Sequence, residues 1–76
     1  MKVFDKVKEY IRMQLPVSDD KVTADARLIE DLGADSANLM MLIMDLESEF
    51  DLTVEDEVLS SIKTVGDIVS YIEAHT

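Results

Sequence analysis

The sequence predicts an all-α protein, a small four-helix bundle with three longer helices, one short helix and a long connection between the first and second helices. Apolar residues recur three and four positions apart along much of the chain. Capping and helix-breaking residues stand at the ends of these segments. No stretch alternates cleanly between apolar and polar residues, as a half-buried strand does. With 76 residues, the chain is expected to form one domain, residues 1–76.

The first helix is expected over residues 2–15, where five apolar residues share one face: Val3, Phe4, Val7, Ile11 and Leu15. Pro16 ends it, because proline lacks the amide hydrogen that a helix interior requires. The connection that follows, "PVSDDKVTADARLIEDLGAD", is long for a segment without regular structure, so it should pack or function. Four apolar residues are expected to fix it to the core: Val22, Leu28, Ile29 and Leu32.

The second helix is expected from Ser36, a suitable N-cap after Gly33, to about Phe50. Its core stripe should consist of Leu39, Leu42, Ile43, Leu46 and Phe50. Residues 57–62 predict a short third helix. The fourth should begin at Thr64, which forms a capping-box pattern with Asp67, and its apolar stripe comprises Val65, Ile68, Val69 and Ile72. His75, the single histidine, is expected in a frayed tail.

The charge is strongly acidic and unevenly distributed. Seventeen acidic and seven basic residues give a net charge of -10. Residues 1–27 hold six basic and five acidic side chains, whereas residues 28–76 hold one basic and twelve acidic ones. Such a surface repels nucleic acid and anionic membranes and attracts basic protein surfaces. The N-terminus resembles no signal peptide and no apolar run is long enough to span a membrane, so a cytoplasmic protein is expected. We also expect a monomer.

The second helix is apolar on more than one side. Beyond the core stripe, Ala37, Met40, Met41 and Met44 fall on the remaining side of the helix, and Met41 points most nearly opposite the core. Burial of Met40 or Met44 under the long connection or the third helix is an alternative. Methionine is flexible and polarizable, and an apolar patch edged by carboxylates is typical of a docking surface. We therefore expect this helix to contact partner proteins.

Ser36 stands where a helix N-terminus favours an attached anion. No histidine or lysine lies near it in sequence, so it lacks the base that a serine nucleophile needs. An ordinary N-cap and a serine modified by another enzyme both remain open on this basis. Cysteine is absent, which excludes thiolate chemistry and cysteine metal sites, and no metal site is predicted.

The segments "VTADARLIEDLGADS", "LESEFDLTVEDE" and "IKTVGDIVSYI" together resemble the acyl carrier proteins from end to end. The resemblance implies a non-enzymatic carrier with phosphopantetheine joined to Ser36 through a phosphodiester. A separate phosphopantetheinyl transferase would attach this arm, whose thiol would carry acyl groups as thioesters for the enzymes of fatty acid biosynthesis. The working thiol would thus come from the cofactor.

The resemblance also assigns roles to individual positions. Asp35 would be recognised by the transferase, and Glu47, Asp56 and Ile62 would contact acyl-chain synthesis or transfer enzymes with basic docking patches. An acyl-chain cleft would be lined by Leu46, Val54, Leu59, Ile62 and Ile68. The departures from the family pattern fall on the second helix: Ala37 replaces a leucine, and Asn38 and Met41 replace acidic residues. These changes suggest an altered set of partners. A carrier for polyketide or aminoacyl units and an unmodified acidic interaction module are the alternatives.

Overall fold

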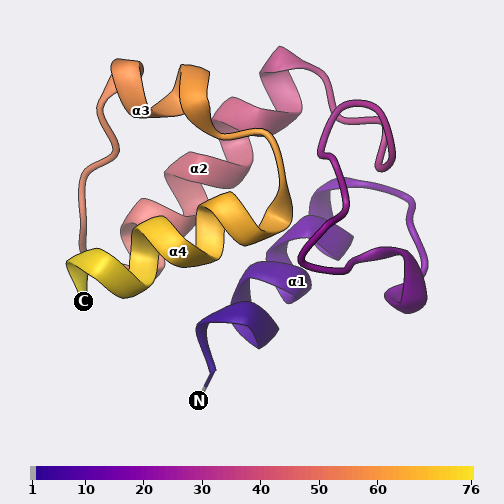
Figure 1. The fold of residues 1–76 in the computed structure, drawn as a ribbon, viewed down its shortest axis with the longest axis horizontal. Helices are drawn as coiled ribbons and strands as arrows, with labels where there is room; N and C mark the ends of the chain where they lie inside the picture. Colours follow the sequence, from indigo (N-terminus) through magenta and orange to yellow (C-terminus); the bar gives the residue numbers. More distant parts are fainter. Residues whose placement is uncertain (1) are drawn as a thin grey trace.

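The structure, a computed structural model, describes residues 2–76, and the regular elements within that part of the chain are all helices (Figure 1). Its elements are α1 (Val3–Gln14), the single turn η1 (Asp19–Lys21), α2 (Ser36–Phe50), α3 (Asp56–Ser61) and α4 (Val65–His75). The prediction of three longer helices, one short helix and a long connection is confirmed. Among the described residues, the only β-type pairing is an isolated bridge between Arg27 and Thr64.

The core lies where α1 packs against both α2 and α4. All three predicted stripes contribute to it, with Val7, Ile11, Leu42, Leu46 and Ile68 each exposing 2 % or less of their surface. The ends of the stripes are less covered, since Val3, Phe4, Leu39 and Phe50 are only partly buried against this core. Within residues 2–76, no side chain in the core is polar or charged. Apolar burial therefore holds the bundle together.

The long connection packs, as its length suggested. Val22, Leu28 and Leu32 are buried, but Ile29 is 58 % exposed, so its predicted role in the core is wrong. Residues 27–33 form helix-like turns in which the amides of Asp31 and Gly33 donate to the carbonyl groups four positions earlier. This geometry turns residues four apart to the same side, so Leu28 and Leu32 face inward while Ile29 faces outward.

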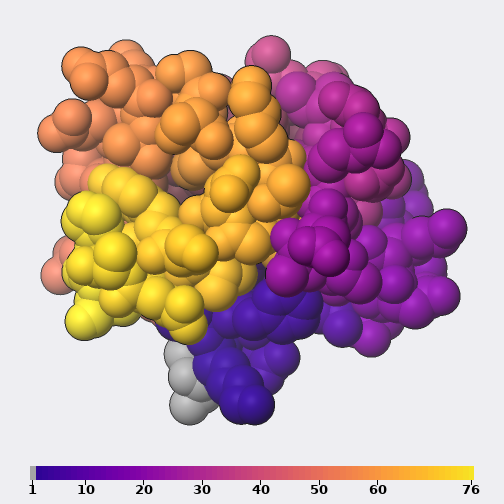
Figure 2. All heavy atoms as spheres, in the orientation of Figure 1, coloured from indigo at the N-terminus to yellow at the C-terminus, as the bar shows by residue number. Residues whose placement is uncertain are grey.

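Backbone hydrogen bonds attach the connection to the start of α4. The Gly66 amide donates to the Ala24 carbonyl at 2.9 Å, the Val65 amide to Ala26 at 3.1 Å, and the Leu28 amide to Lys63 at 3.0 Å. Figure 2 shows the two segments in contact along one face of the molecule. The connection is consequently a structural part of the bundle.

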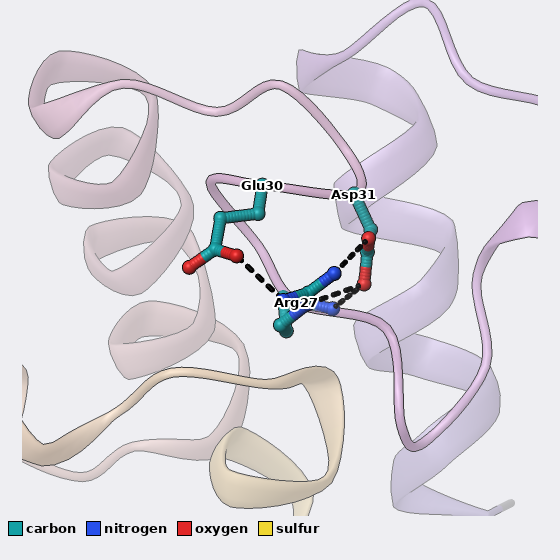
Figure 3. A network of polar contacts seen from close by, with 3 residues as sticks. All are labelled: Arg27, Glu30 and Asp31. Atoms are coloured by element: carbon teal, nitrogen blue, oxygen red, sulfur yellow. Dashed lines mark hydrogen bonds and ion pairs between the residues drawn. The ribbon is translucent and has the colours of Figure 1, made fainter.

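Arg27 fixes the turn that leads toward α2 (Figure 3). Its Nη2 donates to Asp31 Oδ1 at 3.0 Å, its Nε donates to Asp31 Oδ2 at 3.1 Å, and its Nη1 pairs with Glu30. The hydrogen bonds from the Arg27 side chain hold the pKa of Asp31 below its usual value. Gly33 follows with φ of 76°, a left-handed conformation that glycine adopts without strain. The chain thereby reverses before α2.

The helix ends agree with the sequence in part. Thr64 caps α4 with the predicted reciprocal bonds to Asp67, and α3 begins one residue earlier than expected. The N-cap of α2 is Asp35, so the assignment of Ser36 as N-cap is wrong. His75 is also not in a frayed tail, because it belongs to α4 and its ring stacks on Tyr71 at 4.0 Å between centroids. Of the helices described, none has the length and apolar character to cross a membrane.

Candidate functional site

Ser36 is the first residue of α2 and is exposed. The Asp35 side chain accepts a hydrogen bond from the Asn38 amide at 2.8 Å, and the Asn38 side chain accepts one from the Asp35 amide at 3.3 Å. Because Asp35 takes over the capping bonds, the Ser36 hydroxyl is not consumed by capping. The sequence contains a signal for this arrangement. Three positions after Asp35 stands Asn38, whose side chain can accept a hydrogen bond, whereas three positions after Ser36 stands Leu39, whose side chain cannot.

A groove of about 270 Å³ begins at Ser36 and runs between α2 and α3. Its lining consists of Ser36, Leu39, Met40, Ile43, Asp56, Leu59, Ser60 and Ile62. The only ionisable side chain in this set is Asp56, so no histidine or lysine adjoins the serine to activate it. The groove is suited to hold an apolar group next to Ser36.

A second groove of about 580 Å³ shares four of these residues: Leu39, Leu59, Ser60 and Ile62. It extends toward the connection, where its lining is completed by Arg27, Leu28, Ile29, Glu30 and Lys63. Leu59 and Ile62 thus lie between two hollows, one that begins at Ser36 and one that ends at charged side chains. No pattern in the sequence predicted this second hollow.

The five residues expected in an acyl-chain cleft are not all at the groove next to Ser36. Leu59 and Ile62 line it, whereas its lining does not include Leu46, Val54 or Ile68. Leu46 and Ile68 are each 1 % exposed and form part of the central core, and Val54 packs against its edge. Ile62 is 8 % exposed, so a partner protein can reach little of its surface.

The second apolar face of α2 lies at the surface. Met40, Met41 and Met44 are 51 %, 54 % and 60 % exposed, and Ala37 is exposed beside them. The expected exposure of Met41 is confirmed, and the long connection does not bury Met40 or Met44. Residues three and four apart on a helix are neighbours, so these side chains form one continuous patch.

The carboxylates of α2 are engaged within the fold, which the sequence did not indicate. Asp45 accepts from Gln14 Nε2 at 3.0 Å and Glu47 accepts from the Val54 amide at 2.7 Å. Glu49 accepts from the Tyr10 hydroxyl at 2.6 Å. This hydrogen bond raises the pKa of Tyr10 to about 12.

Residues 5–72 match the protein family described as "Phosphopantetheine attachment site". The chain is 56 % identical over 71 residues to an acyl carrier protein of Thermotoga maritima, covering 93 % of this chain and 88 % of that one. An acyl carrier protein of Clostridium perfringens is 47 % identical over 74 residues, which is 97 % of both chains.

Solved structures show the same similarity. An acyl carrier protein from Enterococcus faecalis superposes with a TM-score of 0.85 at 34 % identity, covering 100 % of both chains. A putative acyl carrier protein from Mycobacterium tuberculosis superposes with a TM-score of 0.89 at 34 % identity, covering 97 % of this chain and 99 % of that one.

Proposed function

Because the chain belongs to the acyl carrier protein family, whose cofactor is phosphopantetheine, we propose that Ser36 is the residue that carries the arm. The observation that supports this most directly is the exposed Ser36 hydroxyl at the mouth of an apolar groove. A separate phosphopantetheinyl transferase attaches the arm, since the groove at Ser36 is lined by no histidine or lysine that would activate the hydroxyl.

The surroundings of Ser36 fit a phosphodiester. Ser36 lies at the N-terminus of a helix of 15 residues, where free amide groups and the helix dipole stabilise negative charge. The attached group supplies a thiol, which this cysteine-free chain lacks, and that thiol carries acyl groups as thioesters. The protein itself contributes position and shielding rather than catalysis. Tethering raises the effective concentration of the cargo near the enzymes that bind the carrier.

Leu59 and Ile62 form the wall that a bound chain meets first. Leu46, Val54 and Ile68 lie outside the lining of that groove, so we assign them to a deeper cleft that a long chain fills only when α2 and α3 separate. The apolar contacts that the core loses on opening are replaced by contacts with the acyl chain. The total apolar area removed from water therefore changes little. The whole chain, residues 1–76, acts as one carrier domain.

The partners that this function requires are the transferase and the enzymes of fatty acid biosynthesis. Asp35 adjoins the serine and has one carboxylate oxygen outside the capping bond, which leaves it available to basic residues of the transferase. The carrier works as a monomer in the cytoplasm. Its net charge of -10 favours partners with basic surfaces over nucleic acid.

The test is intact-mass analysis after incubation with a phosphopantetheinyl transferase, coenzyme A and Mg²⁺. The wild-type chain should gain one phosphopantetheinyl group and Ser36→Ala none. Ser48→Ala, at an exposed serine of the same helix, is the matched control and should gain the group. A Ser36→Ala chain that gains the same mass would disprove the assignment. The mass of natively loaded protein would then separate fatty acyl cargo from polyketide or aminoacyl cargo.

A further inference from the structure

We propose that the second hollow, the groove of about 580 Å³ beside the one at Ser36, receives the far end of an acyl cargo that terminates in a carboxylate, and that Lys63 binds this carboxylate. The cargo is then a dicarboxylic acid that is joined to the arm through one of its two ends. This inference rests on the proposed function, because the cargo is carried on the arm at Ser36.

The second hollow continues the groove that begins at Ser36. Four residues line both of them, and Leu59 and Ile62 are two of these. A chain that enters the groove and passes these two side chains therefore reaches the second hollow. Ile29, which also lines the second hollow, is 58 % exposed. A cargo chain beside Ile29 covers apolar surface that the fold leaves in water.

The two hollows differ in charge. The groove lined by Asp56 contains no other ionisable side chain. The second hollow is lined by two basic side chains and one acidic side chain, Arg27, Lys63 and Glu30, with a net charge of +1. Lys63 is the one basic residue among residues 28–76, which hold twelve acidic ones. The second hollow therefore favours an anionic group, whereas the groove at the serine does not.

The side chain of Lys63 is available to bind an anion. Among residues 2–76, no ion pair involves Lys63. Its main chain is fixed, because its amide donates to Asp67 Oδ2 at 2.9 Å and its carbonyl accepts from the Leu28 amide at 3.0 Å. The side chain is thus anchored at its base, next to the hollow that it lines.

Arg27 adds positive charge at the same end of the hollow but is partly engaged. Its side chain makes three hydrogen bonds, which go to Asp31 and Glu30 on either side of it (Figure 3). A guanidinium has more N–H groups than these bonds use, so donors remain for a further oxygen. Glu30 opposes an anion, because its carboxylate lines the hollow too. We therefore assign the main contact to Lys63 and a smaller one to Arg27.

The apolar core excludes a carboxylate. Leu46 and Ile68, which we assign to a deeper cleft for long chains, are each 1 % exposed, and within residues 2–76 no side chain of the core is polar or charged. A carboxylate moved there loses its hydration and gains no partner, which is strongly unfavourable. A chain with a methyl end can enter the deeper cleft, whereas a chain with a carboxylate end is restricted to the hollow that supplies a cation.

The experiment compares two cargoes on the full chain. A phosphopantetheinyl transferase with octanedioyl-coenzyme A or octanoyl-coenzyme A attaches an arm whose cargo ends in a carboxylate or in a methyl group. Hydroxylamine, a small uncharged nucleophile at neutral pH, then cleaves the thioester. Cleavage is slower when the cargo is held against the protein, because the thioester is then less accessible.

Lys63→Met should accelerate cleavage of the octanedioyl thioester about two- to five-fold, as expected for the loss of a partly exposed ion pair. It should leave the octanoyl rate unchanged, and the difference should fade at high salt. Lys63→Arg should keep the protection. Glu30→Gln should act in the opposite direction and slow octanedioyl cleavage, because it removes a carboxylate from the hollow.

Lys21→Met is the matched control for net charge. Lys21 is exposed, takes part in no ion pair within residues 2–76 and lines neither hollow. Its replacement removes the same charge as Lys63→Met and should leave both cleavage rates unchanged. Thermal midpoints of the unloaded variants establish that each one is folded.

The outcomes separate this inference from the proposed function. A wild-type chain that gains no arm from coenzyme A or from either acyl form would overturn the proposed function itself. If the chain is loaded but Lys63→Met alters both thioesters equally or neither, the binding of a carboxylate by Lys63 is refuted. Equal effects of Lys63→Met and Lys21→Met on the octanedioyl form would refute it too, since net charge alone would then explain the result.

Discussion

Replacing Gly66 by alanine tests whether the connection truly fixes the start of α4. A Cβ atom at this position would lie 2.9 Å from the carbonyl oxygen of Ala24. The same oxygen accepts the hydrogen bond from the Gly66 amide at 2.9 Å. The obstacle is backbone rather than the end of a flexible side chain, so it can move only if the connection moves with it.

Two opposing contributions set the size of the effect. Alanine favours a helix over glycine by up to about 1 kcal/mol, in part through the unfolded chain. Two effects destabilise the variant. Overpacking typically costs about 1–3 kcal/mol, and the hydrogen bond from the residue 66 amide to the Ala24 carbonyl, worth about 1 kcal/mol, must lengthen. We expect a net loss of about 1–2 kcal/mol in the free energy of unfolding. For a domain of this size, that loss lowers the thermal midpoint by roughly 5–15 °C.

The assay is thermal and urea unfolding followed by circular dichroism, with two controls. Ser70→Ala lies on the exposed side of the same helix and should match or slightly exceed the wild-type midpoint. At Gly33, a Cβ would meet nothing within 4 Å, but φ is +76°. Gly33→Ala should therefore lose only about 1 kcal/mol through backbone strain. A Gly66→Ala chain as stable as the wild type would refute the close approach between residue 66 and the Ala24 carbonyl.

Three further predictions concern charge and exposure. Hydrogen bonds from the Lys63 and Thr64 amides lower the pKa of Asp67, so the Asp67 carboxylate stabilises the fold fully above the unfolded pKa of about 3.9 and loses this effect as the pH falls through the lower folded pKa. Asp67→Asn should therefore be less stable than the wild type at pH 7 and lose less stability on acidification, which urea unfolding at several pH values measures. The thermal midpoint should rise between low and moderate salt, because the Debye length shortens to about 10 Å at 0.1 M and screens repulsion among the acidic residues, and divalent cations should act at lower concentration; a midpoint indifferent to both would show that repulsion is not limiting. Met41→Glu should change the free energy of unfolding by no more than about 0.5 kcal/mol, since Met41 is 54 % exposed, while strengthening binding to a partner with a basic patch; a large loss of stability would contradict its exposure.

The sequence by itself determined the helices and their approximate ends. Apolar spacing placed the stripes of α1, α2 and α4, because one face of each helix must be buried in so short a chain. Thr64 and Asp67 identified the start of α4, since their side chains satisfy amides that lie close by in sequence. The exposure of Met41 also followed from the sequence, because its direction is fixed by the turn of its own helix.

The tertiary structure decided what depends on residues far apart in the chain. Ile29 faces outward because the turn of residues 27–33 uses Leu28 and Leu32 to reach the core. The hydrogen bonds that occupy Asp45 and Glu49 come from α1, which lies more than thirty positions earlier in the sequence. The groove at Ser36 exists only because α3 lies against α2. Periodicity describes one helix at a time, whereas these features depend on how the helices and their connections are placed against one another.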